Sequence, residues 1–287
     1  MRLVTLDSRE VGGRPGIALA SGEILDLAAA PSGLAAAQWR PHSVVSVLAE
    51  GEEGAARVAR LVEEHDQASE AQRQEWRRSG RLLPGQGTRL MPPIRRPGLL
   101  LMVTDANGPV SYVKNPNSAA GPEAAIAMPA GADEPLYMLA MAGVVLGRPL
   151  FRGTAVQAER AIAALTLVAD LGTTRSKPGA SGEWTGSRQF PGASVLGPAL
   201  LTIDELRGQA PGPVQVRVNG RPVGTGSSTF DLRKAAALIS ELSSRYAFRP
   251  GDVVVVAAGI PEFELPASSR VTVTLGTLLQ LDFATAG

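Results

Sequence analysis

Three unbroken apolar runs constrain the fold more than any other feature of this chain of 287 residues. They cover residues 99–103, 137–146 and 163–169. A strand with apolar side chains on both faces has to be covered on both faces, so such runs are typical of the central strands of a layered β structure. They predict a buried sheet in the second part of the chain.

A hairpin and one strong helix complete this part. Residues 214–218 alternate and lead into Asn219-Gly220, the pair that supplies the positive φ angles of a type I′ turn. Residues 231–245 carry an apolar stripe of helical period, with Asp231 as the expected N-cap. Three more strands are expected, at residues 253–256, 270–275 and 277–283. Strands with one main helix indicate an α+β fold rather than alternating βαβ units.

The amino-terminal part reads differently and predicts a separate small domain. Residues 1–30 are typical of short strands, and residues 43–79 predict a helix in two pieces that is broken near Gly51. The segment 83–93 is rich in proline and glycine, which favours a linker. We therefore expect a small α/β domain with its linker over residues 1–90 and a β-rich domain over residues 91–287.

Charge and residue usage exclude several classes of function. Lysine and arginine total 28 against 27 acidic residues, a net charge of +1, so the chain has no charge excess for nucleic acid or an anionic membrane surface. No run reaches the roughly 18 apolar residues of a spanning helix, and the first residues lack a signal core, so we expect a cytoplasmic protein.

The scarcity of histidine and cysteine limits the chemistry further. With no cysteine, thiolate metal sites and cysteine nucleophiles are excluded. The two histidines, His42 and His65, both lie in the small amino-terminal part. His65 stands in a charged helix and is expected to be solvated, and His42 reads as a turn residue. A Ser-His-Asp mechanism is therefore not expected.

Asp170 is the first candidate for chemistry, because it ends the third apolar run. A carboxylate at the end of a buried strand needs a partner, since its unpaired burial costs several kcal/mol. It is either a turn cap or a structural partner of Arg175, or else a general base or an anchor for a polar ligand.

Two cations are further candidates. Lys114 is the only lysine in the first 170 residues of a chain that prefers arginine. It is either a surface residue or a cation that binds a carboxylate or stabilises an enolate. Arg188 follows Trp184 in a segment rich in glycine and serine, so it is either part of a surface loop or a bidentate carboxylate ligand.

An ordered series of segments resembles the fumarylacetoacetate hydrolase family. Tyr112-Val113-Lys114 is similar to its Phe-x-Lys motif, and residues 141–148 resemble its Glu-Leu-Ala-Val-Val-Ile-Gly-Arg segment. Together with these two segments, further matches occur in the same order along the chain as in the family. They lie at Pro92 to Gly98, Gly121-Pro122, Ala169-Asp170, Trp184 to Phe190, Leu196-Gly197-Pro198, Val218-Asn219-Gly220 and Phe248 to Asp252. The resemblance covers about residues 90–285 and implies a mixed β-sandwich roll of that family's carboxy-terminal type, assembled as a homodimer.

The departures from the family pattern concern its metal. The family binds Mg²⁺ or Mn²⁺ through Glu-x-Glu and an aspartate, whereas this chain has Leu139 and Met141 at the two glutamate positions and keeps only Asp170. The family's Thr-Gly-Thr-Pro reads Ala258-Gly259-Ile260-Pro261, and the lysine of its Lys-Ser-Phe segment is Arg188. One carboxylate cannot replace three, so we expect no metal ligand set and no cofactor.

The resemblance implies three alternatives for function. The first is a metal-independent enzyme acting on a β-dicarbonyl, 2-oxo acid or polyketide-like compound by cyclisation, isomerisation, decarboxylation or C–C cleavage. The second is a non-catalytic binding or scaffold relative. The third is a Mg²⁺- or Mn²⁺-dependent hydrolase with ligands recruited elsewhere, for instance Asp105, Asp133 or Glu134.

For the first alternative, the expected catalytic residues are Asp170, Lys114 and Arg188. The expected substrate-binding residues are Arg175, Trp184, Thr185, Tyr137, Leu139, Met141, Gly259 and Ile260.

Overall fold

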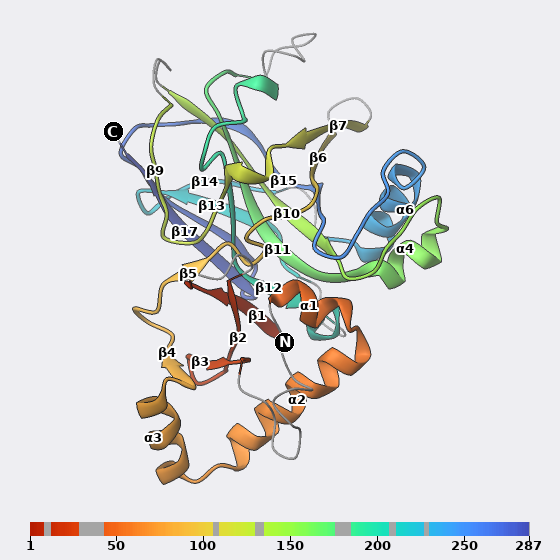
Figure 1. Cartoon of the computed structure of the whole chain (residues 1–287). Coiled ribbons are helices and arrows are strands. Elements are labelled where there is room, and N and C mark those ends of the chain that lie inside the picture. Colours follow the sequence, from red (N-terminus) through yellow and green to blue (C-terminus); the bar gives the residue numbers. More distant parts are fainter. Residues whose placement is uncertain are drawn as a thin grey trace.

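The second and third apolar runs form two long strands that pair with each other. In the computed structural model they are β10 (Leu136–Leu146) and β11 (Ile162–Gly172), which pair antiparallel (Figure 1). The structure describes residues 1–8, 13–28, 43–105, 109–129, 135–175, 185–206, 211–226 and 230–286. The prediction of buried strands is confirmed, because almost every residue of β10 and β11 is buried.

These two strands lie inside a mixed sheet of twelve strands. The first run forms β6 (Leu100–Asp105), which pairs parallel to β15 (Val253–Leu265), while β15 pairs antiparallel to β10. The order along the sheet is β4 (Leu82–Pro84), β3 (Glu23–Asp26), β2 (Arg14–Ala18), β1 (Arg2–Leu6), β12 (Ser194–Thr202), β11, β10, β15 (Val253–Leu265), β6 (Leu100–Asp105) and β7 (Pro109–Lys114), with β5 (Leu90–Met91) on β1 and β8 (Ala119–Ala120) on β12.

A second sheet of five strands packs on one face of the first. Its order is β14 (Arg221–Thr225), β13 (Val214–Val218), β16 (Arg270–Leu275), β17 (Leu279–Thr285) and β9 (Ala125–Ile126). The predicted hairpin is confirmed, since Asn219 and Gly220 join β13 to β14 with φ angles of 51° and 78°. The last predicted strand begins and ends two residues later than expected.

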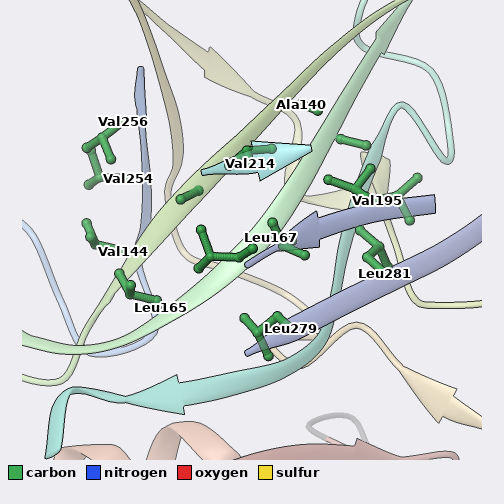
Figure 2. Close-up of a cluster of buried hydrophobic side chains, with 14 of the residues drawn as sticks. Ala140, Val144, Leu165, Leu167, Val195, Val214, Val254, Val256, Leu279 and Leu281 are labelled. Carbon is green, nitrogen blue, oxygen red and sulfur yellow. The ribbon is translucent and has the colours of Figure 1, made fainter. Parts of the chain in front are cut away.

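The core between the two sheets is apolar. Figure 2 shows side chains of both sheets meeting there, among them Val144 and Leu167 of the large sheet and Val214 and Leu281 of the small one. Alternate residues of a strand point to opposite faces, so the even-numbered residues of β10 fill this core. The odd-numbered Leu139, Met141 and Val145 belong to a second cluster on the other face, which they share with Leu3 and Val58 of the amino-terminal part.

The amino-terminal strands extend the large sheet, because β1 pairs antiparallel with β12. The predicted break near Gly51 is confirmed, but the region 43–79 forms three helices instead of the expected two. They are α1 (Val44–Ala49), α2 (Glu52–Gln67) and α3 (Glu70–Ser79). The second break follows from a capping box, in which the Ser69 side chain accepts from the Gln72 amide and the Gln72 side chain accepts from the Ser69 amide. The predicted linker contains β4 and β5.

The remaining helices lie beside the sheets. Among the described residues they are α4 (Ala155–Ala161) and α6 (Leu232–Leu242), with short 3₁₀ turns η1 (Pro116–Ser118) and η2 (Ile203–Leu206). Asp231 is the N-cap of α6, as predicted, and accepts from the amides of Arg233 and Lys234. Among the described residues, no helix combines the length and the apolar character needed to cross a membrane.

Candidate active site

Asp170 lies near the end of β11, on the face turned away from the five-stranded sheet. Its neighbour across the ladder is Leu139 of β10 on one side and Ser194 of β12 on the other. Directly opposed residues of an antiparallel pair point to the same face, so Asp170 and Leu139 share one surface of the sheet. The Asp170 side chain has no exposed surface, so its charge needs partners within the fold.

Lys114 is the first of these partners. It ends β7, and its Nζ lies 2.5 Å from Oδ1 of Asp170. The same ammonium donates to the carbonyl oxygens of Arg188 and Ala193, so each of its three N–H groups has an acceptor. Burial lowers the pKa of the Lys114 ammonium below its usual value, and the Asp170 carboxylate opposes that shift.

Tyr112 is the second partner and lies two residues earlier on β7. Its hydroxyl donates to Oδ2 of Asp170 over 2.5 Å. Burial raises the pKa of Tyr112 well above its usual value, and repulsion from the adjacent Asp170 carboxylate adds to the rise. The Tyr112 side chain is therefore a neutral hydrogen-bond donor, and the period of the strand places it on the same face as Lys114.

Arg188 is the third partner and comes from the segment 185–190. Its Nη1 donates to the backbone oxygen and to Oδ2 of Asp170, both over 3.0 Å, and its Nη2 donates to Oε1 of Glu262. Gly172 makes room for it, because a Cβ there would lie 2.7 Å from Cγ of Arg188. Gln189 ties the segment to β7 by accepting from the Asn115 amide over 2.7 Å and donating to the Val113 carbonyl.

The three predicted catalytic residues are thus brought together, and their side chains have no exposed surface. The alternatives that put Lys114 and Arg188 on the surface are wrong. So is a structural pair of Asp170 with Arg175, since Arg175 is exposed and the described residues show no ion pair between the two.

The predicted substrate-binding residues occupy different environments. Leu139 and Met141 are buried on the Asp170 face, and Tyr137 lies half-buried on that face two residues further along β10. Gly259 is half-buried against Met141, and Thr185 begins the segment that carries Arg188. Ile260 packs instead into the core between the sheets. Trp184 lies outside the described residues, as do His42, Asp133, Glu134 and the side chain of Asp105.

One prediction about histidine is wrong. His65 is buried, with 6% of its surface exposed, and its ring packs beside Trp76 at 6.2 Å between centroids. The helix turns this position inward with Val58 and Leu61, although charged residues flank it in the sequence. It lies in the amino-terminal part, outside the cluster around Asp170.

Sequence reasoning missed Glu262 and gave Tyr112 no role. Tyr112 carried a usable signal, because it lies two residues before Lys114 on an expected strand. Glu262 carried no such signal, because the ladder between β10 and β15 is irregular at this residue. We define the charged network as Tyr112, Lys114, Asp170, Arg188 and Glu262.

A large groove exists elsewhere and contains none of these residues. It has a volume of about 1460 Å³ and is lined mainly by α1, α2, α4 and η2. Its charged lining residues, such as Glu52, Arg148 and Glu159, are exposed. We place the candidate site at the charged network instead, because buried charges in mutual contact with perturbed pKa values are typical of functional sites.

Comparison with known proteins shows which family the chain belongs to. The family model for the fumarylacetoacetate hydrolase C-terminal domain matches residues 102–278, and the chain belongs to this family. Over 161 residues the chain is 27% identical to the human mitochondrial oxaloacetate tautomerase, a match that covers 55% of this chain and 51% of that enzyme. The match thus spans about half the length of this curated relative.

Solved structures share the fold, and some of them share it over the whole chain. Maleylpyruvate hydrolase from Sphingobium superposes with a TM-score of 0.72 at 17% identity and covers 100% of this chain and 99% of its own. The 2-hydroxyhepta-2,4-diene-1,7-dioate isomerase from Mycobacterium marinum has a TM-score of 0.60 at 22% identity and covers 72% of this chain and 81% of its own. The α+β fold expected from the sequence is confirmed.

The family's metal can be tested against the residues present. A structure of the Sphingobium hydrolase contains manganese(II) and pyruvate. Hard divalent ions bind several carboxylate oxygens. Here Asp170 is held by an ammonium and a guanidinium, Glu262 is held by the same guanidinium, and the described residues contain no cluster of three potential metal-binding side chains. This donor set does not fit a resident divalent cation.

Proposed function

We propose that this protein is a metal-independent enzyme of the fumarylacetoacetate hydrolase family that acts on a 2-oxo acid or β-dicarbonyl compound. The observation that carries the proposal is the meeting of Lys114 and Arg188 at Asp170, on the strand face where the family pattern expects carboxylates. Proteins similar to it are named as an oxaloacetate tautomerase, a maleylpyruvate hydrolase and a 2-hydroxyhepta-2,4-diene-1,7-dioate isomerase. Reactions of such substrates share an enol or enolate form.

The network supports stabilisation of negative charge on oxygen. When a proton leaves the carbon beside a ketone, the charge moves to the carbonyl oxygen, and fixed cationic donors in a site shielded from water lower the free energy of that state. Lys114 and Arg188 are such donors. Asp170 already accepts from Lys114, Tyr112 and Arg188, which supports a role as counter-charge rather than as the base that removes the proton.

Keto–enol interconversion is the smallest reaction that uses this feature, because it moves one proton from carbon to oxygen and breaks no other bond. Cyclisation, decarboxylation and C–C cleavage add a second step to the same enolate. A homodimer and a polyketide-like substrate stay predictions.

The test is an ultraviolet assay of oxaloacetate enol–keto conversion with EDTA-dialysed protein. We expect a rate above that of buffer that does not change with EDTA or Mn²⁺, and that falls at least about tenfold in Lys114→Met and Arg188→Met, the range of a lost transition-state donor. Lys234→Met and Arg217→Met, both at exposed positions, are matched controls. A rate that appears only with Mn²⁺, or equal rates in the variants and their controls, would contradict the proposal.

A non-catalytic relative is the second candidate, and one observation favours it. All three donors of the Lys114 ammonium have acceptors within the fold, so this cation is satisfied without a ligand. In that case no compound in a panel of oxo acids and β-dicarbonyls would react faster with the protein than in buffer, whether or not the compound binds.

A further inference from the structure

Glu262 enters the charged network through an irregularity in the ladder between β10 and β15. Ala140 pairs with Ile260 and Met138 pairs with Phe263, so two residues of β15, Pro261 and Glu262, oppose Leu139 alone. Such a bulge turns a side chain out of its regular direction. It brings the Glu262 carboxylate to the guanidinium of Arg188.

Arg188 therefore joins two carboxylates from the strands on either side of β10. Its Nη1 donates to Asp170 of β11 and its Nη2 donates to Glu262 of β15, while Leu139 of β10 stands opposite both positions. The two ends differ in exposure. The Asp170 side chain has no exposed surface, whereas 10% of the Glu262 side chain is exposed. An arriving molecule therefore meets Glu262 before it meets the other charged groups.

The charges of the network restrict what can replace Glu262. Lys114 and Arg188 contribute two positive charges, and Asp170 and Glu262 contribute two negative charges. If Glu262 swings away and a neutral molecule enters, the buried guanidinium keeps only one of its two carboxylate partners. If a carboxylate enters, the charge balance and the fork geometry of the guanidinium are both preserved.

We propose that Glu262 is an exchangeable latch on Arg188, and that the carboxylate of a substrate displaces the Glu262 carboxylate and binds Nη2 of Arg188 in its place. The identity of the ligand as a substrate rests on the proposed function above. Because of the latch, the substrate has to carry a carboxylate, and the corresponding neutral compound binds less well.

Calorimetric binding of pyruvate and of its uncharged amide, pyruvamide, tests the latch. Glu262→Gln removes the internal competitor and leaves a positive charge for the ligand, so we expect pyruvate to bind at least about fivefold more tightly than to the wild type. Pyruvamide should bind both proteins equally. Glu264→Gln, at an exposed position of the same strand, is the matched control and should bind pyruvate as the wild type does.

The latch is overturned if Glu262→Gln binds pyruvate no better than Glu264→Gln does, or if pyruvamide gains as much as pyruvate. If Glu262→Gln does not fold, Glu262→Asp keeps the charge and shortens its reach. Glu262→Asp should then bind pyruvate more tightly than the wild type does, by less than the factor expected for Glu262→Gln, and should bind pyruvamide as the wild type does. A pyruvate affinity equal to that of the wild type overturns the latch.

Binding and turnover separate the two proposals. If Glu262→Gln binds pyruvate more tightly but no oxo acid is turned over, the latch is supported and the proposed enzymatic function is rejected. Turnover in the wild type without tighter binding in the variant rejects the latch alone.

Discussion

The two faces of the β10–β11 pair are both largely buried but are stabilised in different ways. Towards the five-stranded sheet, Val144 and Leu167 pack among other apolar side chains. On the opposite face, Asp170 is held by Lys114 and Arg188 beside Leu139. The apolar face gains stability from area and close packing, which many combinations of side chains supply. The charged face depends on particular partners, because the loss of one leaves another charge buried alone.

The largest expected effect comes from breaking the charged face. Lys114→Met removes one cation and leaves Asp170 undercompensated, so we expect the free energy of unfolding to fall by about 3–5 kcal/mol. Urea denaturation at neutral pH measures this. The double variant Lys114→Met/Asp170→Leu removes an opposite pair of charges and should lose less than the single variant does.

The apolar face supplies the control for this experiment. Leu167→Met nearly conserves volume and should cost less than about 1.5 kcal/mol. If the double variant is as unstable as the sum of Lys114→Met and Asp170→Leu, the two charges do not act as a pair, and the contrast between the faces fails.

A smaller effect is expected where the charged face is tightly packed. In Gly172→Ala the new Cβ would lie 2.7 Å from Cγ and 3.0 Å from Cζ of Arg188, so the arginine has to move. Crowding of this kind costs about 1–3 kcal/mol. We expect a lower urea midpoint together with slower turnover. Gly186→Ala, whose Cβ would meet no atom within 4 Å, should change neither.

An effect of similar size concerns the neutral donor Tyr112 and has a defined pH dependence. Tyr112→Phe removes a hydrogen bond to the Asp170 carboxylate and should cost about 1.5–3 kcal/mol at neutral pH. Because the pKa of Tyr112 is raised, the folded protein keeps this proton above pH 10, where an unfolded tyrosine loses it. The stability that Tyr112 contributes is therefore complete below about pH 10 and is lost as pH rises towards its folded pKa.

Urea denaturation from pH 8 to pH 11 measures the free energy of unfolding of the wild type and of Tyr112→Phe. The difference between the two free energies should become smaller above about pH 10. The lowered pKa of Lys114 acts in the opposite direction at lower pH, since stability rises as the folded lysine loses a proton that the unfolded one keeps. Tyr246→Phe, at a half-buried tyrosine outside the network, is the matched control.

Local patterns predicted most of the elements, and the errors have physical reasons. The apolar runs, the Asn219-Gly220 turn and the Asp231 cap depend on interactions between near neighbours, so their signals are present in short segments. The break at Ser69 carried a local signal as well, in the glutamine three residues later. The burial of His65 depends on which side of α2 faces the sheet, and the flanking charges concealed it.

By itself the sequence determined which side chains were available for chemistry and which strands had to be buried. It contained one acid at the end of a buried strand, one isolated lysine and an arginine in place of a lysine. Only the tertiary structure decided that these three meet, that Tyr112 joins them and that Glu262 completes the charge balance. The reason is that the network joins β7, β11, β15 and the segment 185–190, which are distant in the sequence. In addition, a bulge in β15 changes the strand register, so a regular alternation along the strand does not predict where the Glu262 side chain points.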